Sequence, residues 1–225
     1  MGDNEHVQVS PARYQILVVD DHPIVRQGLR RLIDEEDDLA VCGEVDSSEG
    51  AKAAIRDLRP DIVIVDISLK HGDGIELVQH ARAHDAALKI LVLSMHDEMM
   101  YAERLLAAGA NGYIMKEAAS EQLLLALRRV LEGGVYVSEA IGSRMIQTMA
   151  AGGTHVSPNP IDRLSTREVQ ILHMIGKGLA TRQVAEVLSL SVKTVESHRE
   201  RIKRKLNLAS GSQLVQYAVS WFGAA

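Results

Sequence analysis

The chain has 225 residues, of which 46% are hydrophobic and 24% are charged, a composition typical of a globular protein with one or two domains. A single cysteine, Cys42, excludes an intramolecular disulfide, and no stretch approaches the roughly 18 consecutive apolar residues of a membrane helix. These features exclude disulfide-stabilised and membrane-spanning proteins. They predict a cytoplasmic protein without a membrane partner.

The net charge of −5 conceals a difference between the two parts of the chain. Residues 1–137 carry 14 basic and 24 acidic side chains, whereas residues 138–225 carry 11 basic and 6 acidic ones. An acidic first part and a basic second part predict two domains with different partners. Nucleic acid is a candidate partner of the basic part.

Five apolar runs alternate with five amphipathic segments in the first part of the chain, after a polar stretch over residues 1–13 that we expect to be frayed. The run between Asp61 and Asp66 is apolar throughout, as strands buried on both faces of a parallel sheet are. Strands that alternate with helices predict an α/β fold with a doubly wound five-stranded parallel sheet. We expect strands at residues 15–20, 39–45, 61–66, 89–94 and 112–116, and helices at 23–33, 47–58, 74–84, 98–108 and 120–132.

Polar side chains stand where four of these strands end. Asp20 and Asp21 follow the first strand, Asp66 ends the third, Ser94 the fourth and Lys116 the fifth. The carboxyl ends of parallel strands form one edge of a sheet, where ligands bind, although Asp66 taken alone could instead cap the next helix. Crowded carboxylates need a proton or a cation between them, and oxygen ligands suit Mg²⁺. A carboxylate beside Mg²⁺, a lysine and a hydroxyl is well arranged to attack a phosphoryl group.

Residues 14–134 resemble the receiver domain of two-component response regulators. The resemblance implies a flavodoxin-like strand order of 2-1-3-4-5 and a domain that accepts a phosphoryl group from a histidine kinase. It rests on residues at the family's spacing: Asp20-Asp21, Asp66, Asp73-Gly74, Ser94, Gly109-Ala110, Tyr113 and Lys116.

The resemblance also assigns roles around the acidic edge. It makes Asp66 the phosphoacceptor, with Asp20 and Asp21 organising Mg²⁺ together with Asp66 and the backbone carbonyl of Ser68. One position departs from the pattern, because Lys70 stands four residues after Asp66, where many receivers have proline. That difference bears on the geometry of the loop and on the lifetime of the phosphoryl group.

By the same resemblance, Ser94, Tyr113 and Lys116 are the switch residues. The hydroxyl of Ser94 moves towards the phosphate and the ring of Tyr113 fills the space behind it. Each residue also has a structural interpretation: Ser94 could cap a helix, Tyr113 could be a core side chain and Lys116 could be a surface lysine. His80 and His84 are four residues apart and could bind a metal from one helix face, but no further Cys or His ligand stands nearby, so a solvated helix face is favoured.

Residues 135–160 are predicted to be a linker. A helical pattern runs over residues 139–151, and the Gly152-Gly153 pair with Pro158 and Pro160 cannot continue it. Beyond the linker, Ser165 and Glu168 form a capping-box pattern.

The basic part of the chain then carries two short helical patterns, which open at Thr181 and Val192 and are separated by a turn at residues 189–191. This arrangement predicts a helix-turn-helix. The alternative for the basic helix is an amphipathic helix with a solvated charged face.

Residues 160–225 resemble the LuxR-type DNA-binding domain. Combined with the receiver pattern, the chain resembles response regulators of the NarL/FixJ family. The resemblance implies a small all-α domain of four helices, of which the third lies in the major groove and the fourth, about residues 212–221, offers a dimer face. It rests on residues 164–168, Gly178, Val184-Ala185, Leu188, Ser191, Thr194-Val195, His198, Ile202 and Lys205-Leu206.

The third helix offers two kinds of contact to DNA. Its basic side chains and Thr194 suit the phosphates, which position a protein. Ser197 and the two glutamates are candidates for base edges, which specify sequence, since a glutamate can accept from cytosine N4. Ion pairs between Glu196 and Arg199 or between Glu200 and Arg204 are structural alternatives. The predicted DNA-binding residues are Lys193, Thr194, Val195, Glu196, Ser197, His198, Glu200, Arg201 and Lys205.

The sequence therefore predicts a response regulator and not an enzyme. Phosphorylation of Asp66 is expected to free the DNA-binding helix or to promote a homodimer, which binds two half-sites of double-stranded DNA, with RNA polymerase as a further candidate partner. One alternative is a phosphatase of the haloacid dehalogenase type, but that family has a second acid where this chain has Ser68, and it does not explain residues 160–225. Another alternative is a constitutive DNA-binding protein whose receiver serves only for dimerisation.

Overall fold

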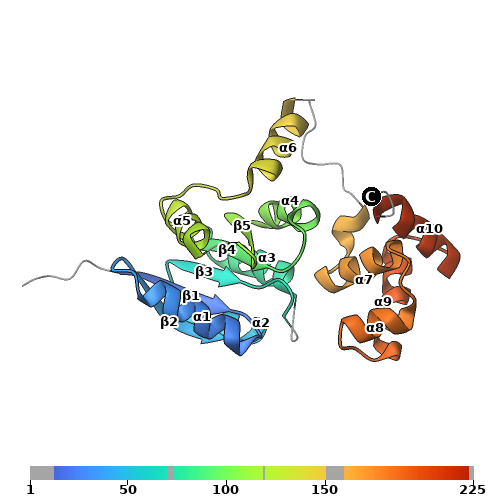
Figure 1. Cartoon of the computed structure of the whole chain (residues 1–225), viewed down its shortest axis with the longest axis horizontal. Helices are drawn as coiled ribbons and strands as arrows, with labels where there is room; N and C mark the ends of the chain where they lie inside the picture. The colour runs from blue at the N-terminus through green and yellow to red at the C-terminus, as the bar shows by residue number, and fades with distance from the viewer. Residues whose placement is uncertain (1–12, 70–72, 119, 151–159, 223–225) are drawn as a thin grey trace, which may run out of the picture. The chain divides into compact units, whose positions relative to one another are not determined.

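The structure is a computed structural model that describes residues 13–69, 73–118, 120–150 and 160–222. The chain divides into an N-terminal unit, formed chiefly by residues 13–138, and a C-terminal unit that begins at Glu139 (Figure 1). The expected frayed terminus, the position of Lys70 and the Gly152-Gly153 and Pro158 part of the predicted linker lie outside the described residues. Among the described residues, every helix is too short or too polar to cross a bilayer.

The N-terminal unit is a five-stranded parallel sheet in the order β2-β1-β3-β4-β5, which confirms the predicted fold. The strands alternate with helices along the chain, so strands that are consecutive in sequence are joined by a helix. The elements are β1 (Tyr14–Val19), α1 (Pro23–Asp34), β2 (Leu39–Val45), α2 (Ser48–Leu58), β3 (Ile62–Val65), α3 (Gly74–His84), β4 (Lys89–Ser94), α4 (Glu98–Ala108), β5 (Gly112–Met115) and α5 (Ser120–Leu131).

The sheet has an apolar layer on each side because its strands are buried on both faces. Successive side chains of a strand point to opposite faces. Ile16, Ile62 and Leu91 belong to one set, which forms a continuous core with Leu29 of α1 and Leu127 of α5. The alternate set faces the other side of the sheet, where α2, α3 and α4 contribute the buried side chains Ala51, Leu77, Val78, Tyr101, Ala102 and Leu105.

The register of the central strands brings the ends of β1 and β3 together. Val19 is paired with Val65 across the two strands, and the amide of Asp66 donates to the carbonyl oxygen of Val19 at 2.8 Å. Asp20 and Asp66 therefore leave the sheet side by side. The switch between β1 and β3 is also where the chain connection reverses direction, the usual position of a ligand site in such sheets.

The turn from α4 into β5 is held by Arg82 of α3. Gly109 ends α4 with a φ of 109°, a left-handed conformation that favours glycine. The guanidinium of Arg82 donates to the Gly109 carbonyl oxygen at 2.8 Å and to the Asn111 side-chain oxygen at 2.9 Å. These bonds fix the start of β5, the strand that ends just before Lys116.

The C-terminal unit is helical, as predicted. After α6 (Glu139–Ala150) and a 3₁₀ turn at Pro160–Arg163, it comprises α7 (Thr166–Gly176), α8 (Thr181–Val187), α9 (Val192–Lys205) and α10 (Gly211–Phe222). The helices α7, α8, α9 and α10 share one small core, and its buried side chains include Val169, Ile171, Leu172, Val184, Val195, Ile202, Leu214 and Ala218.

Two local devices set the ends of these helices. Ser165 and Glu168 form the predicted capping box at the start of α7. Between α8 and α9, Ser189 has a φ of 52°, and the Ser191 hydroxyl accepts from the amide of Thr194 at 3.0 Å, so it caps α9. The tight turn and the cap produce the predicted helix-turn-helix.

Candidate functional site

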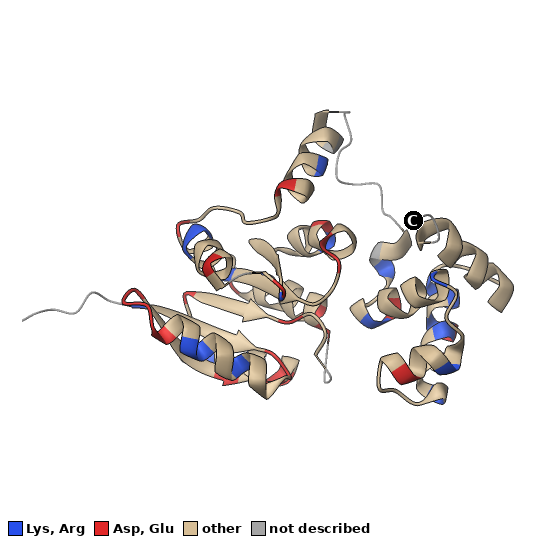
Figure 2. Ribbon diagram, in the orientation of Figure 1, with Lys and Arg blue, Asp and Glu red and all other residues tan. Residues whose placement is uncertain are grey.

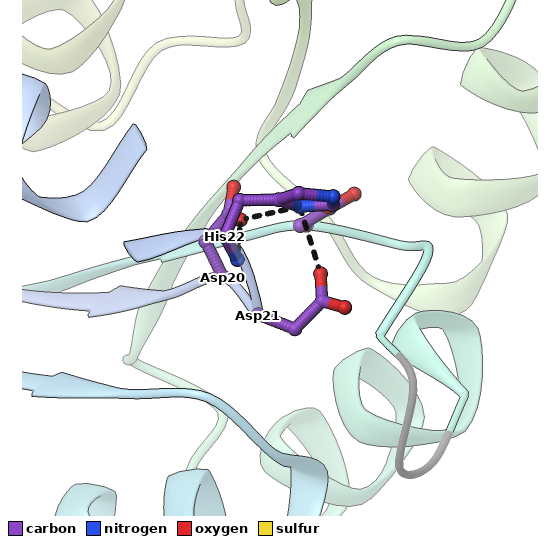
Figure 3. A group of neighbouring side chains, drawn as sticks. Asp20, Asp21 and His22 are labelled. Carbon is purple, nitrogen blue, oxygen red and sulfur yellow. Dashed lines mark hydrogen bonds and ion pairs between the residues drawn. The ribbon is translucent and has the colours of Figure 1, made fainter. Parts of the chain in front are cut away.

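Three carboxylates crowd the carboxyl edge of the sheet at the end of β1 and β3. Donor atoms of Asp20, Asp21, His22 and Asp66 all lie within 4.8 Å of one another, and Figure 3 shows the first three of these residues. Asp20 is 2% exposed and Asp66 is 3% exposed. Buried carboxylates at this separation repel one another and must be compensated by positive charge.

Lys116 supplies part of that charge. Its Nζ donates to Asp20 Oδ2 at 2.6 Å and to Asp66 Oδ2 at 2.8 Å, and only 8% of its side chain is exposed. Burial lowers the pKa of Lys116, but the attraction of Asp66 and Asp20 outweighs burial and raises the pKa above its ordinary value. Lys116 is therefore a buried cation and not a surface lysine.

The pocket has the donors that a hard divalent cation requires. Asp20, Asp21 and Asp66 offer carboxylate oxygens, and one lysine does not balance three carboxylates, so a net negative charge is left at the edge of the sheet. Carboxylate oxygens fit an ion such as Mg²⁺, which is bound through a few carboxylates and keeps several of its waters. The donor set therefore fits the predicted cofactor.

His22 is a member of the pocket that sequence reasoning missed. Its amide donates to Asp20 Oδ1 at 2.8 Å, and its Nδ1 lies 2.9 Å from Asp21 Oδ1. Figure 3 shows the imidazole beside both carboxylates. The available signal was position alone, because His22 directly follows the acid pair and precedes the proline that opens α1.

Ser94 and Tyr113 lie at the same edge, on β4 and β5, and both are buried. The amide of His96 donates to the Ser94 hydroxyl at 3.1 Å, and the Tyr113 hydroxyl donates to the His96 carbonyl oxygen at 2.7 Å. Burial raises the pKa of Tyr113, so it stays neutral. Asp97, and not Ser94, caps α4 by accepting from the amide of Met99.

His96 also reaches the loop that follows the candidate phosphoacceptor. Its Nε2 is hydrogen-bonded to the Ser68 hydroxyl, while the amide of Ser68 donates to Asp66 Oδ1 at 3.0 Å. The backbone and the ring of His96 thus connect Ser68, Ser94 and Tyr113. The sequence offered no periodic or motif signal for this residue, which lies in the loop between β4 and α4.

Most of the side chains expected to contact DNA are accessible on α9. Lys193, Glu196, Ser197, Glu200 and Arg201 are exposed, and Figure 2 shows lysines and arginines along this helix. The Ser197 hydroxyl donates to the Lys193 carbonyl oxygen within the helix. α9 therefore presents both a positive surface and hydrogen-bonding groups, the combination that a DNA-reading helix needs.

Three of the predicted DNA-binding residues face the protein instead of solvent. Val195 is fully buried, so its side chain packs in the core, and we remove it from the candidate contacts. His198 is half-buried, and burial together with the charge of Arg201 lowers its pKa, which leaves it neutral at pH 7. Lys205 Nζ donates to the buried Glu168 Oε2 at 2.6 Å.

For the two glutamates of α9, the described ion pairs differ from the pairs that the sequence suggested. Glu200 forms an ion pair of 2.9 Å with Lys203, three residues further along the helix. In the described ion pairs, its partner is therefore Lys203 and not Arg204. Within the described ranges, Glu196 makes no ion pair with Arg199. An exposed pair such as Glu200 with Lys203 contributes little to stability, so both glutamates stay available to another partner.

The contact of Lys205 with Glu168 predicts that Lys205 stabilises the C-terminal unit, whereas the exposed Lys193 on the same helix does not. Lys205→Met is expected to lower the free energy of unfolding of the C-terminal unit by about 2 kcal/mol, less than for a fully buried pair because a third of the lysine side chain is exposed. Lys193→Met is the matched control, because Lys193 is exposed at the start of the same helix.

Urea unfolding followed by the fluorescence of Trp221, the single tryptophan of the chain, measures both variants. Equal stability of the two variants would contradict a structural role for Lys205.

Two family models match the chain, one in each unit. The model described as Response regulator receiver domain matches residues 16–128. The model described as Bacterial regulatory proteins, luxR family matches residues 162–218. The first contains the acidic pocket with Lys116, and the second contains the helix-turn-helix.

Similar proteins extend over both units. Oxygen regulatory protein NreC of Staphylococcus aureus (strain JH9) is 35% identical over 210 residues, which cover 91% of this chain and 96% of that protein. RcsB from Salmonella enterica serovar Typhimurium, bound to promoter rprA with the phosphomimetic BeF₃⁻, has a TM-score of 0.56 and 27% identity over 92% of this chain and 98% of that chain. A LuxR-family two-component response regulator from Aurantimonas sp. SI85-9A1 has a TM-score of 0.57 and 35% identity over 62% of this chain and 99% of that chain.

The two matched families, in this order on one chain, agree with the acidic pocket at the edge of the sheet and with the helix-turn-helix that follows it. The chain therefore belongs to the NarL/FixJ family of two-component response regulators, with a receiver domain and a LuxR-type DNA-binding domain.

Proposed function

We propose that this response regulator accepts a phosphoryl group on Asp66 from a histidine kinase and that phosphorylation controls the binding of α9 to promoter DNA. The observation that carries the proposal is the placement of Asp66, which is buried at the end of β3 and hydrogen-bonded to Lys116 at 2.8 Å. In this proposal the receiver comprises residues 14–134, the linker 135–160 and the DNA-binding domain 160–225.

The transfer would use one oxygen of Asp66 as the nucleophile. A bond forms between that oxygen and phosphorus, the bond between phosphorus and the kinase imidazole breaks, and the imidazole keeps the electron pair and takes up a proton. The amide of Ser68 and Nζ of Lys116 hold the two carboxylate oxygens in a fixed orientation. Lys116 also neutralises charge that develops on the transferred group.

Asp20, Asp21 and Asp66, with the backbone carbonyl of Ser68, would hold Mg²⁺. The ion supplies positive charge to the phosphoryl oxygens when it is bound. Lys116 brings one positive charge to three carboxylates, so a bound cation would relieve the remaining repulsion between them. We therefore expect phosphorylation to depend on a divalent cation.

Ser94 and Tyr113 would transmit the effect of Asp66 phosphorylation to the rest of the receiver. Both residues are tied to the backbone of His96, so a Ser94 hydroxyl that turns to a phosphoryl oxygen would break its bond with the His96 amide and release the loop. A shift of this kind biases two pre-existing states of the receiver. The active state would form a homodimer that binds two half-sites and could contact RNA polymerase. Among the similar structures, RcsB is described as dimers bound to DNA.

The protein would act in the cytoplasm, where it would meet chromosomal DNA, and it would not act as an enzyme. Two alternatives make different predictions. A constitutive DNA-binding protein would bind DNA equally well without phosphate. A phosphatase of the haloacid dehalogenase type would release phosphate continuously, although Ser68 stands where that family has its second acid.

The test is the intact mass of the full-length protein after incubation with acetyl phosphate, with and without Mg²⁺. Wild type is expected to gain one phosphoryl group only when Mg²⁺ is present, and Asp66→Asn is expected to gain none. Asp66→Asn should stay folded because asparagine keeps an oxygen for the amide of Ser68. The matched control is Asp61→Asn, at the other end of β3, where the exposed carboxylate accepts from the amide of Gln15.

Binding of both proteins to promoter DNA completes the test. Phosphorylated wild type should bind more tightly than Asp66→Asn, and equal binding would support the constitutive alternative. An adduct that persists in Asp66→Asn would place the phosphoacceptor elsewhere, and steady release of phosphate over many turnovers would support the phosphatase.

A further inference from the structure

His80 and His84 lie on the surface of α3 and take no part in the acidic pocket. Their ring centroids are 4.0 Å apart and their planes are inclined by 32°. Positions four residues apart face the same side of a helix, so both rings project from one patch. His80 is half-buried and His84 is exposed, so the patch is open to solvent.

The hydrogen bonding of His84 fixes which of its nitrogens is available. Nδ1 of His84 lies 2.8 Å from the carbonyl oxygen of His80. A carbonyl oxygen only accepts, so Nδ1 carries the proton and the lone pair lies on Nε2. Histidines that bind metals usually donate their other ring nitrogen to a carbonyl or carboxylate in this way, which orients the ring and makes the free nitrogen more basic.

The surroundings keep the other imidazole unprotonated at neutral pH. Burial, the neighbouring His84 and the charge of Lys52 lower the pKa of His80, while Glu49 acts in the opposite direction. Only the neutral form of imidazole has a lone pair to give to a metal. His80 therefore offers an unprotonated nitrogen close to the ring of His84, whose Nε2 takes no part in the hydrogen bond with the His80 carbonyl oxygen.

We propose that His80 and His84 chelate one divalent transition-metal ion, with two imidazole nitrogens as ligands and water in the remaining positions. Two nitrogen donors favour ions such as Ni²⁺, Cu²⁺ and Zn²⁺ over Mg²⁺, which prefers oxygen. This site is separate from the proposed Mg²⁺ pocket in both position and donor chemistry. Its existence does not depend on phosphorylation of Asp66.

α2 supplies two opposing charges beside the site. Glu49 and Lys52 both act on His80, and they form an ion pair of 2.6 Å. Lys52 repels a bound cation, whereas Glu49 attracts it. Lys52→Met is therefore expected to tighten metal binding and Glu49→Gln to weaken it. Equal affinity in these two variants would contradict a cation held at His80.

The test is a calorimetric titration of the full-length protein with NiCl₂ in the presence of saturating MgCl₂, which occupies the acidic pocket. Wild type is expected to bind one Ni²⁺ that His80→Ala and His84→Ala each weaken at least about tenfold, since loss of even an outer partner of a ligand costs that much. His22→Ala, which removes the imidazole of the acidic pocket, is the matched control and should keep the site.

Ni²⁺ should also raise the melting temperature of wild type, because a ligand that binds only the folded protein stabilises it, and should not raise that of His84→Ala. Circular dichroism checks that each variant is folded. Three results would overturn the proposal: no Ni²⁺ binding by wild type, a wild-type isotherm in either histidine variant, or loss of the site in His22→Ala alone.

Discussion

Lys116→Met is expected to lower the free energy of unfolding of the receiver domain by about 3 kcal/mol in the absence of divalent cations. Nζ of Lys116 lies 2.6 Å from Asp20 Oδ2 and 2.8 Å from Asp66 Oδ2. Both carboxylates are buried. Removal of the shared cation leaves two buried carboxylates without compensation, which is the costly way to break a buried ion pair.

Added Mg²⁺ should restore part of this loss, because a cation in the pocket takes over the compensation that Lys116 provides. Urea unfolding followed by circular dichroism, with and without Mg²⁺, measures the effect. Lys89→Met, which replaces a half-buried lysine at the start of β4, is the matched control and should be nearly neutral. A Lys116→Met protein as stable as the Lys89→Met protein would mean that the carboxylates of the pocket repel one another far less than their geometry implies.

The contribution of Lys116 also has a definite pH range. The folded state raises its pKa, because the attraction of Asp66 and Asp20 outweighs the effect of burial. A raised lysine pKa contributes stability that is complete below the unfolded value of about 10.4 and is lost as the pH rises through the folded value. The difference between wild type and Lys116→Met should therefore hold from neutral pH to about pH 10 and shrink above it.

Gly176→Ala is expected to destabilise the DNA-binding domain by about 3 kcal/mol, at the upper end of the usual cost of overpacking. A Cβ on Gly176 would lie 2.6 Å from the Ala218 carbonyl oxygen and 2.9 Å from Phe222 Cβ. The first of these atoms belongs to the backbone of α10, so the conflict can be relieved only by moving α7 and α10 apart. A domain of about 60 residues has a stability of roughly 3 to 9 kcal/mol, so this loss is a large fraction of it.

Fluorescence of Trp221 reports this unfolding directly, because the residue lies on α10. Gly211→Ala is the control on the same helix, since a Cβ there would meet nothing within 4 Å, and it should be neutral or slightly stabilising. Binding to DNA should fall in Gly176→Ala in proportion to the unfolded fraction. A Gly176→Ala domain that unfolds at the same urea concentration as wild type would show that the two helices separate without cost.

Local pattern was sufficient to predict the fold class of each part of the chain, and the family followed from the resemblance of its motif residues to known families. The periodicity of apolar residues located the strands and helices to within about two residues at most ends. This is possible because the spacing of buried side chains in a helix or strand depends only on neighbouring positions in the sequence. β2, β4 and α4 have the predicted bounds. Strand order followed from the resemblance, and register then brings Asp20 and Asp66 together at one edge.

The sequence by itself thus determined the α/β and all-α units and the residue types at the edge of the sheet. Only the tertiary structure decided which side chains use their charges inside the protein. His22 and His96 join the acidic pocket and the candidate switch residues, and Lys205 is drawn to the buried Glu168. These contacts link positions that are far apart in sequence or lie in loops, and no period or spacing encodes such pairs, since they arise only when separate elements pack.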